Sequence, residues 1–188
     1  MLQDIFKTSI YNIKLSVDLE KLNKDINKII NKDKGREVSN SGGYQSNDID
    51  YKSFTQLYFL SEIIEKKARE YKILLGLKEE CIFDNIWINV NKNKDFNITH
   101  IHPSSNLSGV FYVKVPKNSG KIVFENPFLE HISYSWEQEI FNYNNYTSPK
   151  WLIEPEENKL LLFPSFLRHY VKPNLTNEER ISLSFNIK

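Results

Sequence analysis

The hydrophobic pattern changes its period at about Ile82, and this change limits the possible folds more than any other feature of the chain. In Ile86–Asn91 the apolar residues alternate with Trp87, Asn89 and Asn91, which predicts a strand with one apolar and one largely polar face. Further strand-like segments are separated by Pro, Gly and Asn turns: Leu107–Val115, Lys121–Glu125, Leu160–Pro164 and Ile181–Ile187. Many short strands of this kind are typical of a sandwich or jelly roll.

The front third of the chain has a helical pattern instead. One set of apolar residues recurs at helical spacing after a possible N-cap at Ser16 or Asp18: Leu19, Leu22, Ile26, Ile29 and Ile30. A second helix is predicted to begin at a capping box of Ser53 and Gln56 and to stop at Gly76. Its apolar stripe is Leu57, Leu60, Ile64, Tyr71 and Leu74. We expect one α+β, mainly β domain over residues 1–188, with residues 1–80 as helical support and residues 81–188 as the jelly-roll core.

Two segments break these patterns. Residues 31–50 are polar and contain Ser39-Asn40-Ser41-Gly42-Gly43, which predicts a loop or turn. Phe128–Trp151 is long, aromatic and rich in Asn and Ser, and long loops in compact domains are usually functional or disordered. We interpret this second segment as a lid or substrate-facing loop.

Charge and cysteine content exclude several classes. Lys and Arg number 25 against 24 Asp and Glu, so nothing predicts binding to nucleic acid or to an anionic membrane. Cys81 is the only cysteine, which rules out an internal disulfide and a cysteine metal cluster. No stretch has the roughly 18 apolar residues of a membrane span, and the N-terminus lacks a signal-peptide core. We expect a cytoplasmic protein.

The chemistry of the chain centres on its histidines. His100 and His102 stand two apart, so on a strand both point the same way and can reach one ion. His-x-His also arises by chance as polar filling, and the pair alone does not establish a metal site. His169 follows an apolar run 67 residues later and offers a third imidazole.

Arg180 and Ser182 share the polar face of the last predicted strand. An arginine with a neighbouring hydroxyl is well suited to bind a carboxylate. The alternative is an ion pair of Arg180 with Glu178, Glu179 or another acid of the chain.

These residues resemble the 2-oxoglutarate/iron(II) oxygenases, in particular a group found in marine bacteria and their phages. The resemblance covers nearly the whole chain and depends on the combination of several motifs. They are Ser39–Ser46, Trp87–Asn91, His100-Ile-His102-Pro103, Ser108–Tyr112, Phe124–Pro127, Leu162–His169 and Arg180–Asn186.

The resemblance implies a double-stranded β-helix (jelly roll) with the site at one open end. Iron(II) would be bound by His100, His102 and His169, and 2-oxoglutarate by Arg180 and Ser182. With O2, decarboxylation of 2-oxoglutarate to succinate would be coupled to hydroxylation of a substrate C–H bond. Further candidates for contacts to the co-substrate are Asn89 and Tyr112, and for contacts to the substrate Gln45 and Trp136.

One residue departs from the superfamily pattern, which has Asp or Glu where His102 stands. His102 either ligates the metal directly, or lies behind it while a carboxylate such as Glu125 or a water takes its place. We favour direct ligation, because spacing and strand facing match the acid it replaces. His131 falls in the predicted lid and is left as a surface or substrate-side residue.

Three other functions remain open. A three-histidine cupin-type dioxygenase would use no 2-oxoglutarate, a non-catalytic jelly-roll module would bind a ligand without iron chemistry, and a zinc hydrolase would need a general base beside the histidines. The primary substrate, a protein side chain or a small metabolite, is not defined by the sequence, although protein prolyl or other side-chain hydroxylation is slightly preferred. The oligomeric state is also open.

Overall fold

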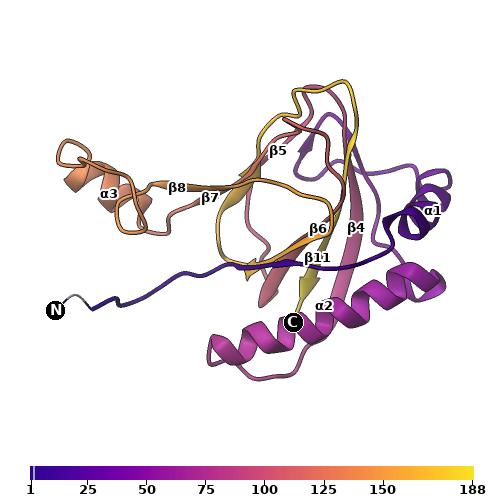
Figure 1. Ribbon diagram of the computed structural model, residues 1–188, viewed down its shortest axis with the longest axis horizontal. Coiled ribbons are helices and arrows are strands. Elements are labelled where there is room, and N and C mark those ends of the chain that lie inside the picture. The colour runs from indigo at the N-terminus through magenta and orange to yellow at the C-terminus, as the bar shows by residue number, and fades with distance from the viewer. Residues whose placement is uncertain (2) are drawn as a thin grey trace.

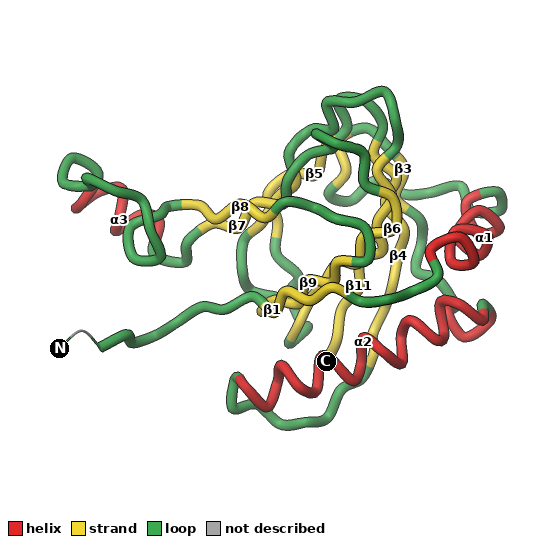
Figure 2. The backbone as a smooth tube through the Cα atoms, viewed as in Figure 1, coloured by secondary structure: helices red, strands yellow, loops and turns green. Residues whose placement is uncertain are grey.

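The computed structural model describes residue 1 and residues 3–188, and its centre is two facing antiparallel sheets (Figures 1 and 2). The helices are α1 (Leu19–Ile30), α2 (Thr55–Leu74) and α3 (Leu129–Trp136), with a short 3-10 turn at Tyr51–Ser53. The strands are β1 (Tyr11–Lys14), β2 (Asn40–Ser41), β3 (Tyr44–Gln45), β4 (Phe83–Asn91), β5 (Phe96–His100), β6 (Leu107–Lys114), β7 (Ile122–Glu125), β8 (Lys150–Ile153), β9 (Lys159–Pro164), β10 (His169–Val171) and β11 (Arg180–Ile187). The predicted mainly β fold is confirmed.

The larger sheet has the strand order β1-β9-β6-β11-β4-β3 and the smaller sheet β2-β5-β10-β7-β8. Strands distant in sequence are therefore neighbours, as in a jelly roll, and every pairing is antiparallel. The strands predicted from alternation correspond to β6, β7, β9 and β11 within one residue, and to β4, which begins three residues before the predicted Ile86. The remaining strands are short or irregular, and their alternation is too brief to stand out in the sequence.

The alternation in β4 and β11 separates two environments. Ile88 of β4 and Leu183 of β11 pack on the outer face against α1 and α2, with Leu22, Ile26, Leu57, Leu60 and Ile64 among their buried partners. A buried aliphatic side chain of this size contributes about 1.5–3 kcal/mol, so this cluster fixes which face of the sheet meets the helices. The polar face of β4 and β11 is thereby turned inward, towards the smaller sheet.

A second apolar cluster lies on the inner side and includes Val110, Ile122, Phe124, Leu161 and Phe163. It fills part of the space between the sheets, next to the inward-facing polar residues of β4 and β11. The interior is therefore apolar in one part and polar in another, and the candidate site lies where the two meet.

The predicted capping box at the start of α2 is wrong. The N-cap of α2 is Phe54, whose side chain caps nothing, and the Ser53 hydroxyl donates instead to Asp50. The Gln56 backbone N–H donates to Asp25 Oδ2 of α1 at 3.0 Å. A buried carboxylate from another helix thus replaces the local cap, which no local sequence pattern could reveal. The predicted N-cap Asp18 of α1 and the stop of α2 before Gly76 are confirmed.

Replacing Asp25 by Ala is expected to lower the free energy of unfolding by about 1–2 kcal/mol, because the α2 terminus loses its acceptor. Ser53→Ala should cost less than about 0.5 kcal/mol, since its hydroxyl is exposed. Urea unfolding of the two variants measures both values. A larger loss of stability in Ser53→Ala than in Asp25→Ala would support the predicted capping box and contradict the role of Asp25.

The front third contributes more than helices. β2 pairs with β5 of the smaller sheet and β3 pairs with β4 of the larger one, so residues predicted as a loop join the two sheets. Gly42 and Gly43 both have positive φ between these strands, where a Cβ would approach Asp95 or the Val90 carbonyl oxygen. The Gly-Gly pair therefore permits the chain to pass from one sheet to the other.

Phe128–Trp151 is not an extended loop over the sheets. It contains α3 and the start of β8, and residues 126–149, between β7 and β8, project from the body as an arm (Figure 1). Within residues 1 and 3–188, no helix is both long enough and apolar enough to span a membrane.

Candidate metal centre and co-substrate pocket

His100 and His169 meet across two strands of the smaller sheet. They are directly opposite in the pairing of β5 with β10, and their ring centroids are 4.4 Å apart. His169 is also opposite Phe124 of β7, whose ring packs at 5.8 Å from the imidazole. Cross-strand pairing of segments 69 residues apart therefore creates the first half of the cluster.

Backbone carbonyls hold both of these imidazoles in one tautomer. Nδ1–H of His100 donates to the Ile98 oxygen at 2.7 Å, and Nδ1–H of His169 donates to the Leu167 oxygen at 2.8 Å. The lone pair then lies on Nε2 of each ring. This is the arrangement by which metal-binding histidines are usually oriented.

His102 completes the cluster from the segment after β5. Its Nε2 lies 3.3 Å from Nε2 of His169, and one ligand atom from each of the three histidines lies within 4.8 Å of the others. Two nitrogens bound side by side at about 2.1 Å from one ion would be roughly 3.0 Å apart. The three rings therefore fit a single metal ion.

The protein keeps the three imidazoles neutral. Burial lowers the pKa of His100, and burial together with the charge of His100 lowers the pKa of His102 to about 4. Burial and the neighbouring histidines lower the pKa of His169 to about 3. Neutral imidazole is the form that binds iron(II), so the site needs no proton loss at pH 7.

We expect acid to destabilise the metal-free protein through this cluster. Because the folded pKa values of His102 and His169 lie below the usual 6.5, the unfolded chain binds more protons as pH falls below that value. Between pH 7 and pH 5 the loss should be about 2 kcal/mol for each of these two histidines, or about 4 kcal/mol together, measured by urea unfolding at both pH values. His102→Gln should reduce this loss and His131→Gln, at an exposed position, should not; equal losses in all three proteins would contradict the interpretation.

Glu125 lies away from the cluster. Phe124 shares the inner face with His169, so Glu125, the next residue on the strand, points outward. Its carboxylate forms ion pairs with Arg168, at 3.2 Å from Nε, and with Lys150, at 3.7 Å from Nζ. Among the described residues, the group whose ligand atoms converge consists of His100, His102 and His169 without Glu125.

Arg180 lies in the same pocket, 2% exposed, and its guanidinium is held by neutral oxygens. It donates to the carbonyl oxygens of Ser119 at 2.7 Å and Gly120 at 2.9 Å and to Asn91 Oδ1 at 2.7 Å. Its Nε–H has no partner, and burial lowers its pKa, an effect that the nearby Tyr112 hydroxyl partly offsets.

The alternative ion pairs of Arg180 are not formed. Glu178 and Glu179 instead face Lys114 and Lys92, and in the part of the chain that the structure describes no carboxylate reaches the guanidinium. A buried cation without a counter-ion is costly. The pocket therefore fits an anionic ligand beside the metal.

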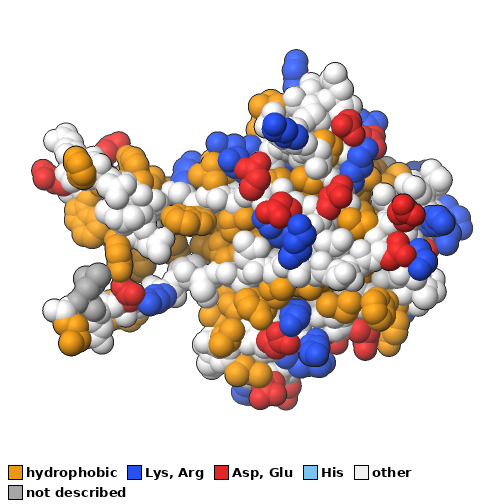
Figure 3. All heavy atoms as spheres, viewed as in Figure 1, with side chains coloured by type: hydrophobic (Ala, Val, Ile, Leu, Met, Phe, Trp, Pro, Cys, Tyr) orange, Lys and Arg blue, Asp and Glu red, His pale blue; other side chains and the backbone are white. Residues whose placement is uncertain are grey.

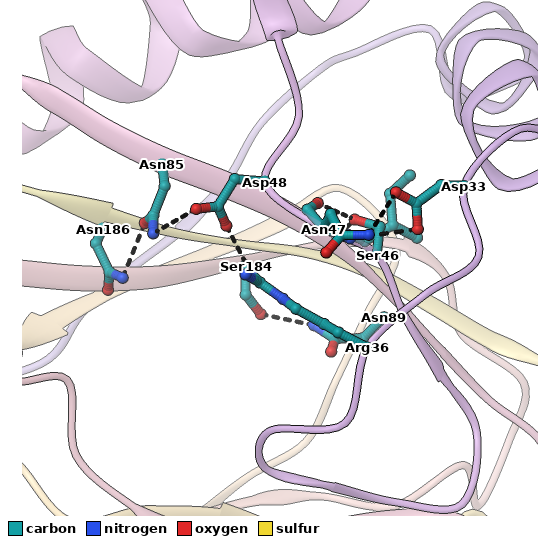
Figure 4. Close-up of polar contacts among 10 residues, drawn as sticks. Asp33, Arg36, Ser46, Asn47, Asp48, Asn85, Asn89, Ser184 and Asn186 are labelled. Atoms are coloured by element: carbon teal, nitrogen blue, oxygen red, sulfur yellow. Dashed lines mark hydrogen bonds and ion pairs between the residues drawn. The ribbon is translucent and has the colours of Figure 1, made fainter.

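The other predicted co-substrate residues share this pocket. Ser182, Asn89 and Tyr112 line it with the three histidines, and Asn89 and Ser182 are opposite each other in the β4–β11 pairing. Asn89 Nδ2 donates to Ser184, whereas its Oδ1 is buried without a partner (Figure 4). Burial raises the pKa of Tyr112 to about 12, so its hydroxyl remains a donor.

The sequence interpretation missed Asn91 and Asn97. Asn91 stood on the predicted polar face, but its bond to Arg180 depends on strand pairing. Asn97 lines the pocket together with His100, three residues away, because a bulge puts two residues of β5 opposite one of β10 between these positions. No regular strand period could have found it.

The two predicted substrate residues do not line this pocket. Gln45 is buried on β3 opposite Asn89, with its Oε1 unpartnered. Trp136 is half-exposed on α3 and lines a separate cleft, as does His131, so its contact with the substrate stays a prediction. The arm carries both residues away from the sheets (Figure 1).

The sheets and the convergent histidines define a metal-binding jelly-roll protein with a cationic ligand pocket. The sequence of residues 85–186, more than half of the chain, matches the family model described as "Putative 2OG-Fe(II) oxygenase". The chain belongs to this family of 2-oxoglutarate/iron(II) oxygenases, which makes it an enzyme using iron(II), 2-oxoglutarate and O2. A search of curated proteins finds no match.

Solved structures agree in fold. A Pseudomonas putida prolyl-4-hydroxylase matches with TM-score 0.63 at 16% identity, covering 96% of this chain and 92% of that one. The viral collagen prolyl hydroxylase of Paramecium bursaria Chlorella virus-1 gives 0.61 at 14%, covering 95% and 94%. The carbocyclase SnoK from nogalamycin biosynthesis gives 0.71 at 13%, covering 96% and 79%.

Proposed function

We propose that this chain is a 2-oxoglutarate-dependent hydroxylase in which His100, His102 and His169 bind iron(II) and Arg180 binds the distal carboxylate of 2-oxoglutarate. The observation that carries the proposal is Arg180, a buried cation held only by neutral oxygens in the pocket of the three histidines. The bound iron supplies oxygen activation coupled to decarboxylation of 2-oxoglutarate to succinate.

The residues of the chain orient the co-substrate and exclude water. We expect Arg180 Nε–H, which is buried without a partner, and the Ser182 hydroxyl to bind one carboxylate, with Asn89 and Tyr112 lining the same pocket. Val110 and Phe163 close the apolar side. Charge–charge contacts are stronger in such a dry pocket than in water.

The competing functions leave this cation unexplained. A cupin-type dioxygenase that binds its substrate at the metal needs no second anion site, and neither does a zinc hydrolase. A binding module would not require three neutral imidazoles with convergent lone pairs. Hydroxylation is preferred over other outcomes because two of the similar structures are named prolyl hydroxylases, although a carbocyclase has the same fold. A protein side chain is accordingly the first substrate to test, followed by small metabolites.

The experiment is an anaerobic titration of the protein with iron(II) and then 2-oxoglutarate. We expect the weak visible charge-transfer band of the chelate, followed in air by slow formation of succinate. Arg180→Ala and Arg180→Lys should bind iron normally and need at least about tenfold more 2-oxoglutarate, since a charged hydrogen-bonding partner contributes about 1.5–3 kcal/mol. Arg168→Ala, at an exposed arginine outside the pocket, is the matched control.

Iron binding without the band, or an unchanged 2-oxoglutarate requirement in both Arg180 variants, would contradict the proposal. The first result would favour a cupin-type enzyme. Absence of iron binding in the wild type would leave a binding module.

A further inference from the structure

The arm formed by residues 126–149 is poorly packed against its own chain. Nearly every residue from Phe128 to Tyr146 is exposed, and Ile132 is the buried residue of α3. An isolated helix of eight residues is unstable in water, because helices of this length depend on packing of an apolar face. The arm therefore needs a surface to pack against that its own body does not provide.

Six of the exposed side chains of the arm are large aromatic ones. They are Phe128, Tyr134, Trp136, Phe141, Tyr143 and Tyr146. The segment of residues 3–10 leaves the body on the same side and adds Ile5 and Phe6 (Figures 1 and 3). Between this segment and the arm lies an open cleft of about 1210 Å³, bridged by the hydrogen bond from Tyr146 to Asp4. Monomeric proteins rarely keep such an apolar surface exposed.

The total exposed area is larger than a compact chain should have. A 22.3 kDa monomer is expected to expose roughly 9,400 Å², whereas this chain exposes 11351 Å². The excess is roughly 1,900 Å², more than the about 800 Å² per partner that a standard interface buries. The arm and the segment of residues 3–10 both leave the body and contribute to this excess area. Both are available for one large interface.

The edge of the smaller sheet continues this surface. β8 is its last strand, so one side of its backbone is unpaired, and both Trp151 and Leu152 are exposed. Both side chains line the same cleft as the arm. An open apolar edge of this kind pairs readily with another chain unless it is covered.

Charge favours a copy of the same chain in the opposite orientation. The arm carries Glu130, Glu137 and Glu139 and no lysine or arginine, and none of these acids forms an ion pair among residues 1 and 3–188. The base of the arm carries Lys150 and Arg168 around the single carboxylate of Glu125. An antiparallel pair would bring each acidic arm against the more basic arm base of its partner, as a two-fold interface requires.

We propose that a second copy of this chain covers the arm, the cleft and the β8 edge, so that the protein is a dimer built on this surface. The interface lies outside the metal pocket and is independent of the proposed function. Dimerisation orders α3, covers the exposed aromatic side chains and pairs the β8 edge.

Sedimentation velocity and light scattering at micromolar concentrations test the proposal. The wild type should have about twice the 22.3 kDa mass of one chain. Replacing Trp136 and Phe141 together by Ser should raise the dissociation constant at least about tenfold, as loss of central aromatic anchors does. Phe59→Ser is the matched control, because Phe59 on α2 is 58% exposed and Trp136 51%.

Hydrogen exchange gives a second readout that does not depend on a variant. Amide protection in α3 should rise with protein concentration if a partner orders the helix. A monomeric wild type, concentration-independent protection, or an arm variant that dimerises as tightly as the wild type would overturn the proposal. The iron titration should be the same in all variants, so a failure at the metal site remains distinguishable.

Discussion

His169→Ala is expected to weaken iron(II) binding by at least about a hundredfold, because even residues that only orient metal ligands contribute ten- to hundredfold. The change removes Nε2 from a cluster in which His102 Nε2 lies 3.3 Å away. Competition with a metal indicator measures the affinity. His131→Ala, on the exposed face of α3, should bind iron as the wild type does and controls for loss of any histidine.

His102 allows a sharper test of the same centre. If it ligates directly, His102→Ala should lose affinity as His169→Ala does, and His102→Asp should regain most of it by supplying a carboxylate at the same place. Undiminished iron affinity in His102→Ala would show that His102 is not a ligand. Since Glu125 is engaged with Arg168 and Lys150, a water would then be the first replacement to consider.

Asn91→Asp is expected to weaken 2-oxoglutarate binding by about ten- to a hundredfold while leaving iron affinity unchanged. The amide oxygen of Asn91 accepts from Arg180 without adding charge, so the guanidinium keeps its full charge for a ligand. A carboxylate at that position would pair with Arg180 and repel the anionic co-substrate, at a cost of about 1.4–3 kcal/mol. Anaerobic calorimetry with the iron-loaded protein measures the change.

The matched control for this charge is Asn93→Asp, two residues further along at an exposed position. It alters the net charge equally and should change 2-oxoglutarate affinity less than about twofold, because surface charges are screened. Equal effects of the two variants would mean that the added negative charge acts through the net charge of the protein and not through its contact with Arg180. Tighter binding in Asn91→Asp would exclude Arg180 as the carboxylate site.

Much of the fold was predictable where one face of an element is buried. Ile88 and Leu183 pack against the helices while Asn89 and Ser182 face the pocket, as a period of two requires. The cap of α2 was not predictable in the same way. The sequence offered Ser53 as a local candidate, but the acceptor is Asp25, about thirty residues earlier and brought close by the packing of α1 on α2.

The candidate site also has a part that could be predicted from the sequence and a part that could not. The three histidines, Arg180 and Ser182 were recognisable because their residue types and order match a family pattern, and the structure brings them into one pocket. Trp136 was predicted as a substrate contact from its aromatic, loop-like surroundings, and this stays a prediction. It lies on the arm and outside the pocket of the histidines, because the long insertion between β7 and β8 continues away from the sheets.

By itself, the sequence determined which residues face the core and which face the pocket, because side-chain direction along a strand depends only on the local period of two. It also determined the chemical types available: three imidazoles, one arginine and a neighbouring hydroxyl. Only the tertiary structure decided that His100 lies opposite His169, that Arg180 is held by Ser119, Gly120 and Asn91, and that the arm leaves the body. Those outcomes depend on strand register and on backbone carbonyls from distant segments, which long-range packing sets and no local pattern encodes.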